Sequence, residues 1–446
     1  MAPLRVGFWG NFGTTNWGNE CTLQAMLHNV RQRLPNARLS CFCSNPDDTR
    51  VRHGVEAFPM RAPKRLSLEW LATLRFASRL DCLVMTGTGM ITDVEEGPLG
   101  MPYDLFRWAV AARAWGVKLA FASVGVEPIR HPAAKRLIGM ALGLADTRSF
   151  RDRQSQDLLK GAGFSCERDS VCPDLAFSLP ESMTARPAKE PGRRRKAAVG
   201  VYNYLGCGAA GGADAASYAN YIEKLGWFVV WLFEHDYDVR ILIGDLTYDA
   251  PVVRDLRAWL EAGPISGHSH QFEDQPATSV DQVIDQIADA DVVVASRFHN
   301  VLFGLLVGRP VLSIAYNAKN DALMGSVGLA DYCRSVDTFE VDDLIERFCA
   351  LEAGARSLLP FVAARVAVYR RELEQQYDVL FGEVDARPLR DAPKAVEVAG
   401  ALPSVRDDGP SPELAGASFG FGRSQRQSSS AALRSAAARD LAHHVD

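Results

Sequence analysis

A strand that turns directly into a helix is the strongest constraint on the fold of this 446-residue chain. Residues 291–295, Asp-Val-Val-Val-Ala, are typical of a buried parallel strand, and residues 301–307 have the length and composition of a helix. Between them lies Ser-Arg-Phe-His, residues 296–299. Such junctions place free helix N–H groups at the edge of a parallel sheet where ligands bind. The stretch therefore predicts an α/β fold with an anion site at residues 296–299.

A third basic residue follows the next predicted strand, residues 310–315. Lys319 leaves the end of that strand in the same sheet, so it can point into the same crevice as Arg297 and His299. A single histidine after a strand is more often structural or solvated. Arg297 two positions before it and Lys319 on the neighbouring strand end favour the functional interpretation, a site for a phosphorylated or carboxylated small molecule.

The N-terminal segment repeats the order of strand, loop and helix. Residues 4–9 are predicted as a strand and residues 21–34 as a helix, and the loop between them is rich in Gly, Asn and Thr. This loop has neither G-x-G-x-x-G nor the Walker pattern, so it indicates neither a dinucleotide nor a nucleoside triphosphate. Plain turns of this kind have about 2 to 6 residues. The extra length favours a substrate-facing loop, with candidate cleft residues Asn16, Asn19 and Glu20.

The first half continues with alternating strand and helix signals. Segment 45–66, rich in Pro and Arg, is expected to be a surface excursion. Residues 86–93 form a turn rich in Gly and hydroxyl groups, whose small residues let the backbone approach a ligand closely. The predicted strands of this half are residues 37–43, 80–85, 118–123 and a short one that ends before Arg151.

Two further charged residues lie at strand ends of this half. Arg151 is a second candidate anion ligand, and a salt bridge with Asp152 or another acid is the alternative interpretation. Asp174 is expected at the edge of the cleft.

The order of elements predicts two α/β domains. Strand and helix signals resume near residue 198, after a segment with Pro, Gly and a block of positive charge. The prediction is two Rossmann-like doubly wound domains facing across a cleft. Residues 361–384 form a long amphipathic helix that packs back across the domains. The predicted parts are domain 1–180, linker 181–197, domain 198–385 and a disordered tail 386–446, rich in Ala, Ser, Gly and Pro.

Composition excludes several classes of protein. The chain is 47% hydrophobic and 23% charged with a net charge of -5, so nothing suggests nucleic acid binding. Nine scattered cysteines without C-x-x-C spacing indicate a reducing cytoplasm and neither disulfides nor a zinc site. The N-terminus has no signal-peptide pattern. No apolar run reaches the roughly 18 to 20 residues of a membrane span, so membrane association is expected to be peripheral at most.

Taken together, these motifs resemble the polysaccharide pyruvyl transferase family over about residues 4–385. The specific part of the resemblance is Ser-Arg-Phe-His at 296–299 with Lys319 downstream. The weaker parts are Asn16-Trp-Gly-Asn-Glu20, the turn at 86–93, Ser149-Phe-Arg-Asp152 and residues 173–177. The resemblance implies a GT-B-like fold. It also implies transfer of the enolpyruvyl unit of phosphoenolpyruvate to a sugar, closure to a cyclic pyruvate ketal and release of phosphate.

The resemblance also implies roles for the candidate residues. Arg151, Arg297 and Lys319 would hold the phosphate and carboxylate of the donor, and His299 would be the acid or another donor ligand. A carboxylate, Asp174 or Glu20, would relieve the acceptor hydroxyl of its proton. Because the basic groups can neutralise the leaving phosphate, neither a metal nor another cofactor is expected.

The acceptor is implied only as a saccharide. Thr86-Gly-Thr-Gly stands where the family commonly has three glycines, which leaves the acceptor open. The expected location is cytoplasmic, and a lipid-linked acceptor would place the enzyme at the inner face of a membrane.

Two other functions compete with this interpretation. A GT-B glycosyltransferase that uses a nucleotide sugar would share the fold and a basic pocket for phosphates. A non-catalytic interaction protein on the same fold would have no need for converging Arg297, His299 and Lys319.

Overall fold

The computed structural model describes residues 3–61, 66–87, 89–94, 96–185, 193–204, 214–263 and 271–385. Met1–Leu389 form one compact unit. The tail predicted as disordered, residues 386–446, lies outside the described residues, as do Thr88 and residues 186–192 of the predicted linker.

The first half contains a parallel sheet of seven strands among the described residues, in the order β3-β2-β1-β4-β5-β6-β7. The chain order reverses between β1 and β4, and ligands of doubly wound sheets bind at such a switch point. The loops that follow β1 and β4 therefore face the candidate site. The strands are β1 Arg5–Trp9, β2 Arg38–Cys43, β3 Glu56–Pro59, β4 Cys82–Thr86, β5 Lys118–Val124, β6 Thr147–Phe150 and β7 Ser170–Val171.

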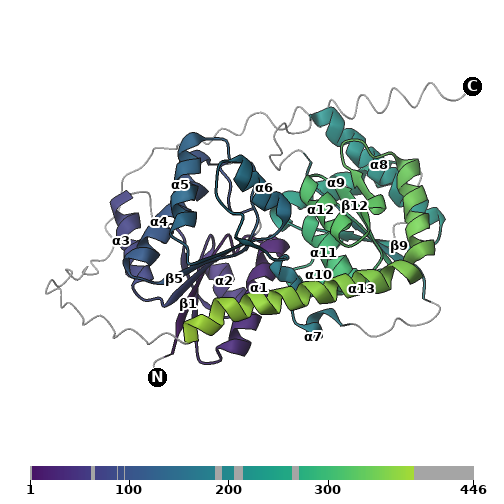
Figure 1. Cartoon of the computed structure of the whole chain (residues 1–446). Helices are drawn as coiled ribbons and strands as arrows, with labels where there is room; N and C mark the ends of the chain where they lie inside the picture. The colour runs from purple at the N-terminus through teal and green to yellow at the C-terminus, as the bar shows by residue number, and fades with distance from the viewer. Residues whose placement is uncertain are drawn as a thin grey trace, which may run out of the picture. The chain divides into compact units, whose positions relative to one another are not determined.

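Helices cover both faces of this sheet (Figure 1). Along β2, Cys41 and Cys43 face the core that contains α1, whereas Phe42 faces the core that contains α4. Both cysteines of β2 thus point to one side of the sheet. The helices are α1 Trp17–Arg33, α2 Pro46–His53, α3 Leu66–Ala77, α4 Met101–Ala114, α5 Pro132–Gly143 and α6 Arg153–Gly161, with the short 3-10 helices η1 Gly97–Leu99 and η2 Leu175–Ser178.

The second half has a parallel sheet in the order β10-β9-β8-β11-β12-β13, with its own switch point between β8 and β11. The predicted fold class of two parallel-sheet α/β domains is confirmed. Its strands are β8 Arg195–Gly200, β9 Tyr237–Leu242, β10 Phe272–Glu273, β11 Val292–Ala295, β12 Val311–Ala315 and β13 Cys333–Ser335. Its helices are α7 Glu181–Thr184, α8 Ala215–Glu234, α9 Leu246–Ala262, α10 Val280–Asp289, α11 Phe298–Leu306, α12 Ala318–Ser326 and the 3-10 helix η4 Ala330–Tyr332.

Helix α13, Val341–Asp385, belongs to the cores of both halves. Leu344 and Phe348 near its start pack with the second sheet, whereas Leu373 and Tyr377 near its end pack with α1 and η2. Polar contacts fix the end: the Tyr377 and Ser178 hydroxyls are 2.7 Å apart. The helix starts twenty residues before the predicted 361, because apolar residues at helical spacing continue back to Leu344.

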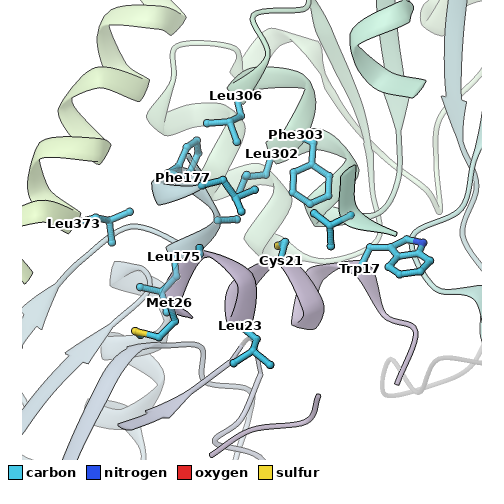
Figure 2. Packing of buried hydrophobic residues seen from close by; sticks show 14 of the residues in the cluster. Trp17, Cys21, Leu23, Met26, Leu175, Phe177, Leu302, Phe303, Leu306 and Leu373 are labelled. Atoms are coloured by element: carbon cyan, nitrogen blue, oxygen red, sulfur yellow. The ribbon is translucent and has the colours of Figure 1, made fainter. Parts of the chain in front are cut away.

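An apolar cluster joins α1, η2, α11 and α13 (Figure 2). Leu302, Phe303 and Leu306 of α11 lie over α1, which contributes Trp17 and Cys21. This buried contact brings the N-terminus of α1, at the switch point of the first sheet, close to that of α11 in the second sheet.

Segment 45–66 differs from the predicted surface excursion, because it contains α2 and β3. Pro46 opens α2, a position that suits proline because its missing N–H would be unpaired there. The Asn45 side chain caps the helix by accepting from the N–H of Asp48, and Gly54 ends it in the left-handed conformation with φ 58°. Pro46, one of the residues on which the predicted surface excursion rested, is therefore the first residue of a helix.

Two predicted boundaries also shift. Helix α1 begins at Trp17 rather than 21, because the Asn16 side chain accepts from the N–H groups of Gly18 and Asn19 and so caps the helix. The predicted linker 181–197 contains α7, and β8 begins at Arg195. Among the described helices, none is long and apolar enough to cross a membrane.

The junction cluster yields a test of stability. Replacing the buried Leu373 by Ala should lower the free energy of unfolding by about 2 to 5 kcal/mol, because it leaves a cavity between α13 and α1. Val379→Ala on the same helix, where the side chain is 55% exposed, should change it by less than about 0.5 kcal/mol. Urea unfolding measures both, and equal losses would contradict the shared core.

Candidate active site

The loop after β1 is attached to the second half of the molecule. The Asn16 side-chain amide donates to Asp245 Oδ2 at 3.0 Å, and the Trp17 N–H donates to the Gly244 carbonyl at 3.0 Å. Gly244 and Asp245 form the turn between β9 and α9. Asn16, predicted as a cleft residue, therefore caps α1 and holds the two halves together.

Glu20, predicted as a cleft candidate and a possible base, is fully buried in the first turn of α1. Its Oε1 accepts from the N–H groups of Gly13 at 2.8 Å and Thr14 at 3.2 Å, and its Oε2 lies 2.8 Å from His53 Nε2. One carboxylate oxygen thus holds the loop and the other contacts α2, so the contacts of Glu20 in this structure are structural. Asn19, the remaining candidate of this loop, is also buried in the first turn of α1.

Arg151, Asp174 and His299 form a buried cluster. His299 Nε2 lies 3.6 Å from Asp174 Oδ2, and Arg151 Nη1 lies 3.9 Å from the same oxygen. These separations exceed normal hydrogen-bond lengths. None of the three atoms has a hydrogen-bond partner among the described residues. The structure thus brings together three of the predicted site residues, two from the first half and one from the second.

Asp174 is held by its place at the start of η2, where its Oδ1 accepts from the Ala176 N–H at 3.0 Å. Burial alone would raise the pKa of this carboxyl. The nearby His299 imidazole, the Arg151 guanidinium and the Ala176 N–H outweigh burial and hold the pKa of Asp174 below its ordinary value. The Asp174 carboxylate is therefore an anion, and it lies between the His299 imidazole and the Arg151 guanidinium.

The packing of His299 depends on Gly18. A Cβ atom at Gly18 would stand 2.1 Å from His299 Nδ1, far inside contact distance, so only glycine leaves room for the ring. The aromatic rings of Phe298 and Phe303 flank the imidazole, with centroids 5.2 and 6.1 Å away. Gly18, in the sequence Asn16-Trp-Gly-Asn-Glu20, thus leaves space beside α1 for the His299 side chain of the second half.

Arg151 reaches across the same junction. Its Nε donates to Asp152 Oδ2 at 2.9 Å, so the salt bridge considered from the sequence is present. The guanidinium also lies over the Phe298 ring at 4.8 Å and beside Gly125, where a Cβ would come within 3.2 Å of it. The pairing with Asp152 therefore orients Arg151 and leaves its Nη1 directed at the cluster.

Arg297, which was predicted to hold the donor, pairs with a carboxylate in this structure. Its Nε and Nη2 donate to both oxygens of the buried Asp249, at 2.9 and 2.6 Å, and its guanidinium lies over the Tyr202 ring at 4.7 Å. The Tyr202 ring stacks on Tyr316 at 4.0 Å, and Lys319 Nζ lies 5.5 Å from the Tyr316 centroid. Arg297 and Lys319 therefore each contact one ring of a tyrosine pair.

Lys319 faces the first half, where its Nζ lies 4.0 Å from Glu127 Oε1. The Glu127 carboxylate lies close to Gly89, since a Cβ at Gly89 would approach it to 3.1 Å. A Cβ at Gly125 would in turn come within 2.7 Å of the Gly89 N–H and 3.2 Å of the Arg151 guanidinium. A continuous series of contacts thus connects Lys319 to the Arg151 cluster.

Sequence reasoning did not select Glu127. The available signal was its position just beyond the end of β5, three residues after Val124, in the same sheet edge as the glycine turn at 86–93.

The N-terminus of α11 has the chemistry of an anion site. Its N-cap residue is Arg297, and no side chain caps the first N–H groups. These groups carry a partial positive charge from the helix dipole. The unpartnered Nε2 of buried His299 lies in the same first turn, so charge and a proton donor meet there. Within the described ranges, no three His, Cys, Asp or Glu side chains are grouped as a metal site.

Comparison with known proteins adds the family and the fold. A family model described as polysaccharide pyruvyl transferase matches residues 16–318. No curated protein matches the chain.

Solved structures that resemble the chain share its architecture at low sequence identity. A putative UDP-N-acetylglucosamine 2-epimerase from Listeria monocytogenes has a TM-score of 0.60 at 10% identity, covering 87% of this chain and 98% of its own. A glycosyltransferase from Rickettsia africae has a TM-score of 0.54 at 9% identity, covering 85% and 99%. The UDP-GlcNAc 2-epimerase of Methanocaldococcus jannaschii has a TM-score of 0.53 at 8% identity, covering 78% and 92%. At these identities the likeness shows the GT-B-like fold alone.

The Asp174 cluster predicts a pH-dependent stability. Because the folded pKa of Asp174 is depressed, its contribution is complete above the unfolded value of about 4 and is lost as pH falls through the folded pKa. Asp174→Asn should therefore lower the free energy of unfolding by about 1 to 3 kcal/mol at pH 7, and by clearly less near pH 3.

Urea unfolding across this pH range measures the difference. Asp157→Asn, at a carboxylate that is 70% exposed beside Lys160, provides the control and should show little difference at any pH. A constant gap between wild type and Asp174→Asn from pH 3 to 7 would contradict the ionised state of Asp174.

Proposed function

Because this chain belongs to the polysaccharide pyruvyl transferase family, we propose that it transfers the pyruvyl group of phosphoenolpyruvate to a saccharide as a ketal, releasing phosphate. The family makes the protein an enzyme of polysaccharide synthesis that acts on a saccharide acceptor. The donor and the ketal chemistry are the proposal.

One observation carries the proposal: three buried polar atoms that have no hydrogen-bond partner in the described part of the chain meet at the junction of the halves. They are Arg151 Nη1, Asp174 Oδ2 and His299 Nε2. Buried polar groups are nearly always paired, so such a group is a natural place for ligand atoms. Two of the three can donate to an anion, and the third is a carboxylate oxygen 3.6 Å from the imidazole.

Phosphoenolpyruvate fits the charge of the surroundings. Its phosphate and carboxylate need several donors, which we assign to Arg151, Lys319 and the uncapped N–H groups of α11. Arg297 lies at the same helix end, and its bidentate contact with Asp249 balances its charge and fixes the direction of its guanidinium. Because these groups can neutralise the leaving phosphate, the proposed reaction needs no metal.

His299 is the proposed acid of the reaction. It delivers a proton to the methylene carbon of the donor, which becomes a methyl group and leaves C2 electrophilic. Two sugar hydroxyl oxygens then bond to C2, while the C2–O bond to phosphate breaks and its electron pair leaves with phosphate. Of the two hydroxyl protons released overall, one balances the proton used at carbon and the other leaves on hydrogen phosphate.

The first test is binding and turnover. Phosphoenolpyruvate should raise the thermal midpoint, because a ligand that binds only the folded state stabilises it. With free and lipid-linked saccharide acceptors, the enzyme should release phosphate and add a pyruvate ketal detectable by mass spectrometry. His299→Asn should keep donor binding and lower kcat by about 10² to 10⁴-fold. His235→Asn, at an exposed histidine on the outer end of α8, is the control.

A thermal shift with nucleotide sugars and none with phosphoenolpyruvate would overturn the proposal in favour of glycosyl transfer. Unchanged turnover in His299→Asn would remove the histidine from the chemistry while leaving the donor assignment intact.

A second prediction concerns the room left for the imidazole. Gly18→Ala should lower turnover by about 10²-fold, because the new Cβ displaces His299 from its position. Alanine favours the helix itself by about 1 kcal/mol, so the local helix has no reason to unfold. Gly143→Ala in α5 has nothing within 4 Å of the new atom and should keep full activity. Full activity in Gly18→Ala would show that the imidazole position does not matter.

A further inference from the structure

The geometry points to Glu127 as the group that takes the proton from the acceptor hydroxyl, with Lys319 holding its carboxylate until the donor binds. This inference rests on the proposed function and adds the residue that the sequence did not select.

The position of Glu127 suits contact with an incoming saccharide. It lies just beyond β5 in the first half, beside Gly89 of the turn that follows β4, and its carboxylate is 43% exposed. Lys319 of the second half, a proposed donor ligand, is 4.0 Å away. Through Gly89 and Gly125 the same contacts lead to the Arg151 guanidinium. Glu127 is therefore beside the donor site and open to solvent at the same time.

The other carboxylates around the site are either engaged in hydrogen bonds or buried away from an incoming saccharide. One oxygen of Glu20 holds the loop after β1 and the other contacts His53 of α2, and both oxygens of Asp249 accept from Arg297. Asp174 is buried next to His299. Asp93, in the turn after β4, accepts from the N–H groups of Arg130 and His131.

Asp152 is engaged as well. One of its oxygens accepts from Arg151 Nε, and the other caps α6 by accepting from the Ser155 N–H. Glu127 has Lys319 as its only side-chain ion-pair partner in the described part of the chain, and at a distance beyond hydrogen bonding. Among the carboxylates around the site, Glu127 is thus the one whose ion-pair partner a ligand can replace.

The proton balance assigns Glu127 a defined step. A sugar hydroxyl gives its proton to the Glu127 carboxylate while its oxygen bonds to C2 of the pyruvyl group. The glutamic acid then returns the proton to the departing phosphate or to water, so the side chain is regenerated for the second hydroxyl. No oxidant, reductant or further reactant is required.

The contact with Lys319 gives the step an order. The Lys319 ammonium lies 4.0 Å from the Glu127 carboxylate, so a donor anion that binds Lys319 competes with Glu127 for the same cation. When the donor anion pairs with Lys319, the Glu127 carboxylate loses this partner and can turn to the acceptor hydroxyl. The donor therefore prepares the group that activates the acceptor, and it should bind first.

The test compares Glu127→Gln with wild type. Removing a competing anion from Lys319 should leave the Kd for phosphoenolpyruvate unchanged or a few-fold lower, whereas kcat should fall by about 10² to 10⁴-fold. Wild-type kcat should decline at acidic pH as the base is protonated, and this decline should be absent from the residual activity of the variant. In Glu127→Ala, added formate should restore part of the rate, because a small carboxylate can replace the missing base.

Glu340→Gln is the matched control. Glu340 also pairs with a lysine, Lys224, at 2.8 Å, but this ion pair lies between α8 and the start of α13. The variant should keep wild-type kcat and pH profile. Initial-rate patterns in wild type should show that the donor binds first.

The outcomes separate the two proposals. If wild type neither binds phosphoenolpyruvate nor releases phosphate from it, the proposed function fails. If wild type is active and Glu127→Gln keeps its kcat and its acidic decline, Glu127 is not the base. A strong loss of donor affinity in Glu127→Gln, without a loss of kcat, would show that the residue organises the donor site instead.

Discussion

Helix α1 packs against helix α11, and this contact connects the two sheets. The packing is apolar, with Trp17 and Cys21 of α1 in one buried cluster with Leu302, Phe303 and Leu306 of α11. Helix α13 supports it from one side, because residues from its two ends belong to the cores of the two halves. Each helix follows the carboxyl end of a central strand, so the contact brings two ligand-binding edges together. The close approach of Gly18 and His299 is a direct result of this packing.

Charge at this junction is balanced by pairs. Arg151 lies between Asp152 and Asp174, Arg297 is bound to Asp249, and Lys319 faces Glu127. Burying a cation without a partner costs several kcal/mol, so a site rich in arginine needs such counter-ions to fold. These ion pairs differ in geometry and in burial. The Arg297 pair is bidentate and buried, whereas the Lys319 pair is long and exposed, so an anionic ligand can compete for Lys319 far more easily.

Much of the fold could be predicted from the sequence, because strand and helix periodicity is local. The buried run 292–295 and its junction with α11 needed only neighbouring residues to be recognised. The same holds for Arg151 and His299, which follow strand ends and meet in the structure.

The contacts that could not be predicted depend on residues far away in the sequence. The role of Glu20 is set by His53, which lies in a helix interpreted as loop, and the engagement of Arg297 is set by Asp249. Glu127 gains its meaning from Lys319 in the other half, and such a contact requires the packing of the whole molecule.

In the proposed mechanism, the two proton transfers involve side chains that differ in burial. His299 is enclosed between aromatic rings and Gly18, where few water molecules can compete for a proton bound for carbon. Glu127 is partly exposed, which suits a group proposed to meet a saccharide that enters from solvent. Arg151, which touches Phe298 on one side and Gly125 on the other, lies between these two environments. A donor held at Arg151 would therefore present its methylene carbon toward the buried imidazole and its electrophilic C2 toward the open side. This arrangement follows from joining a buried helix terminus of one half to an exposed strand end of the other, and neither half has it alone.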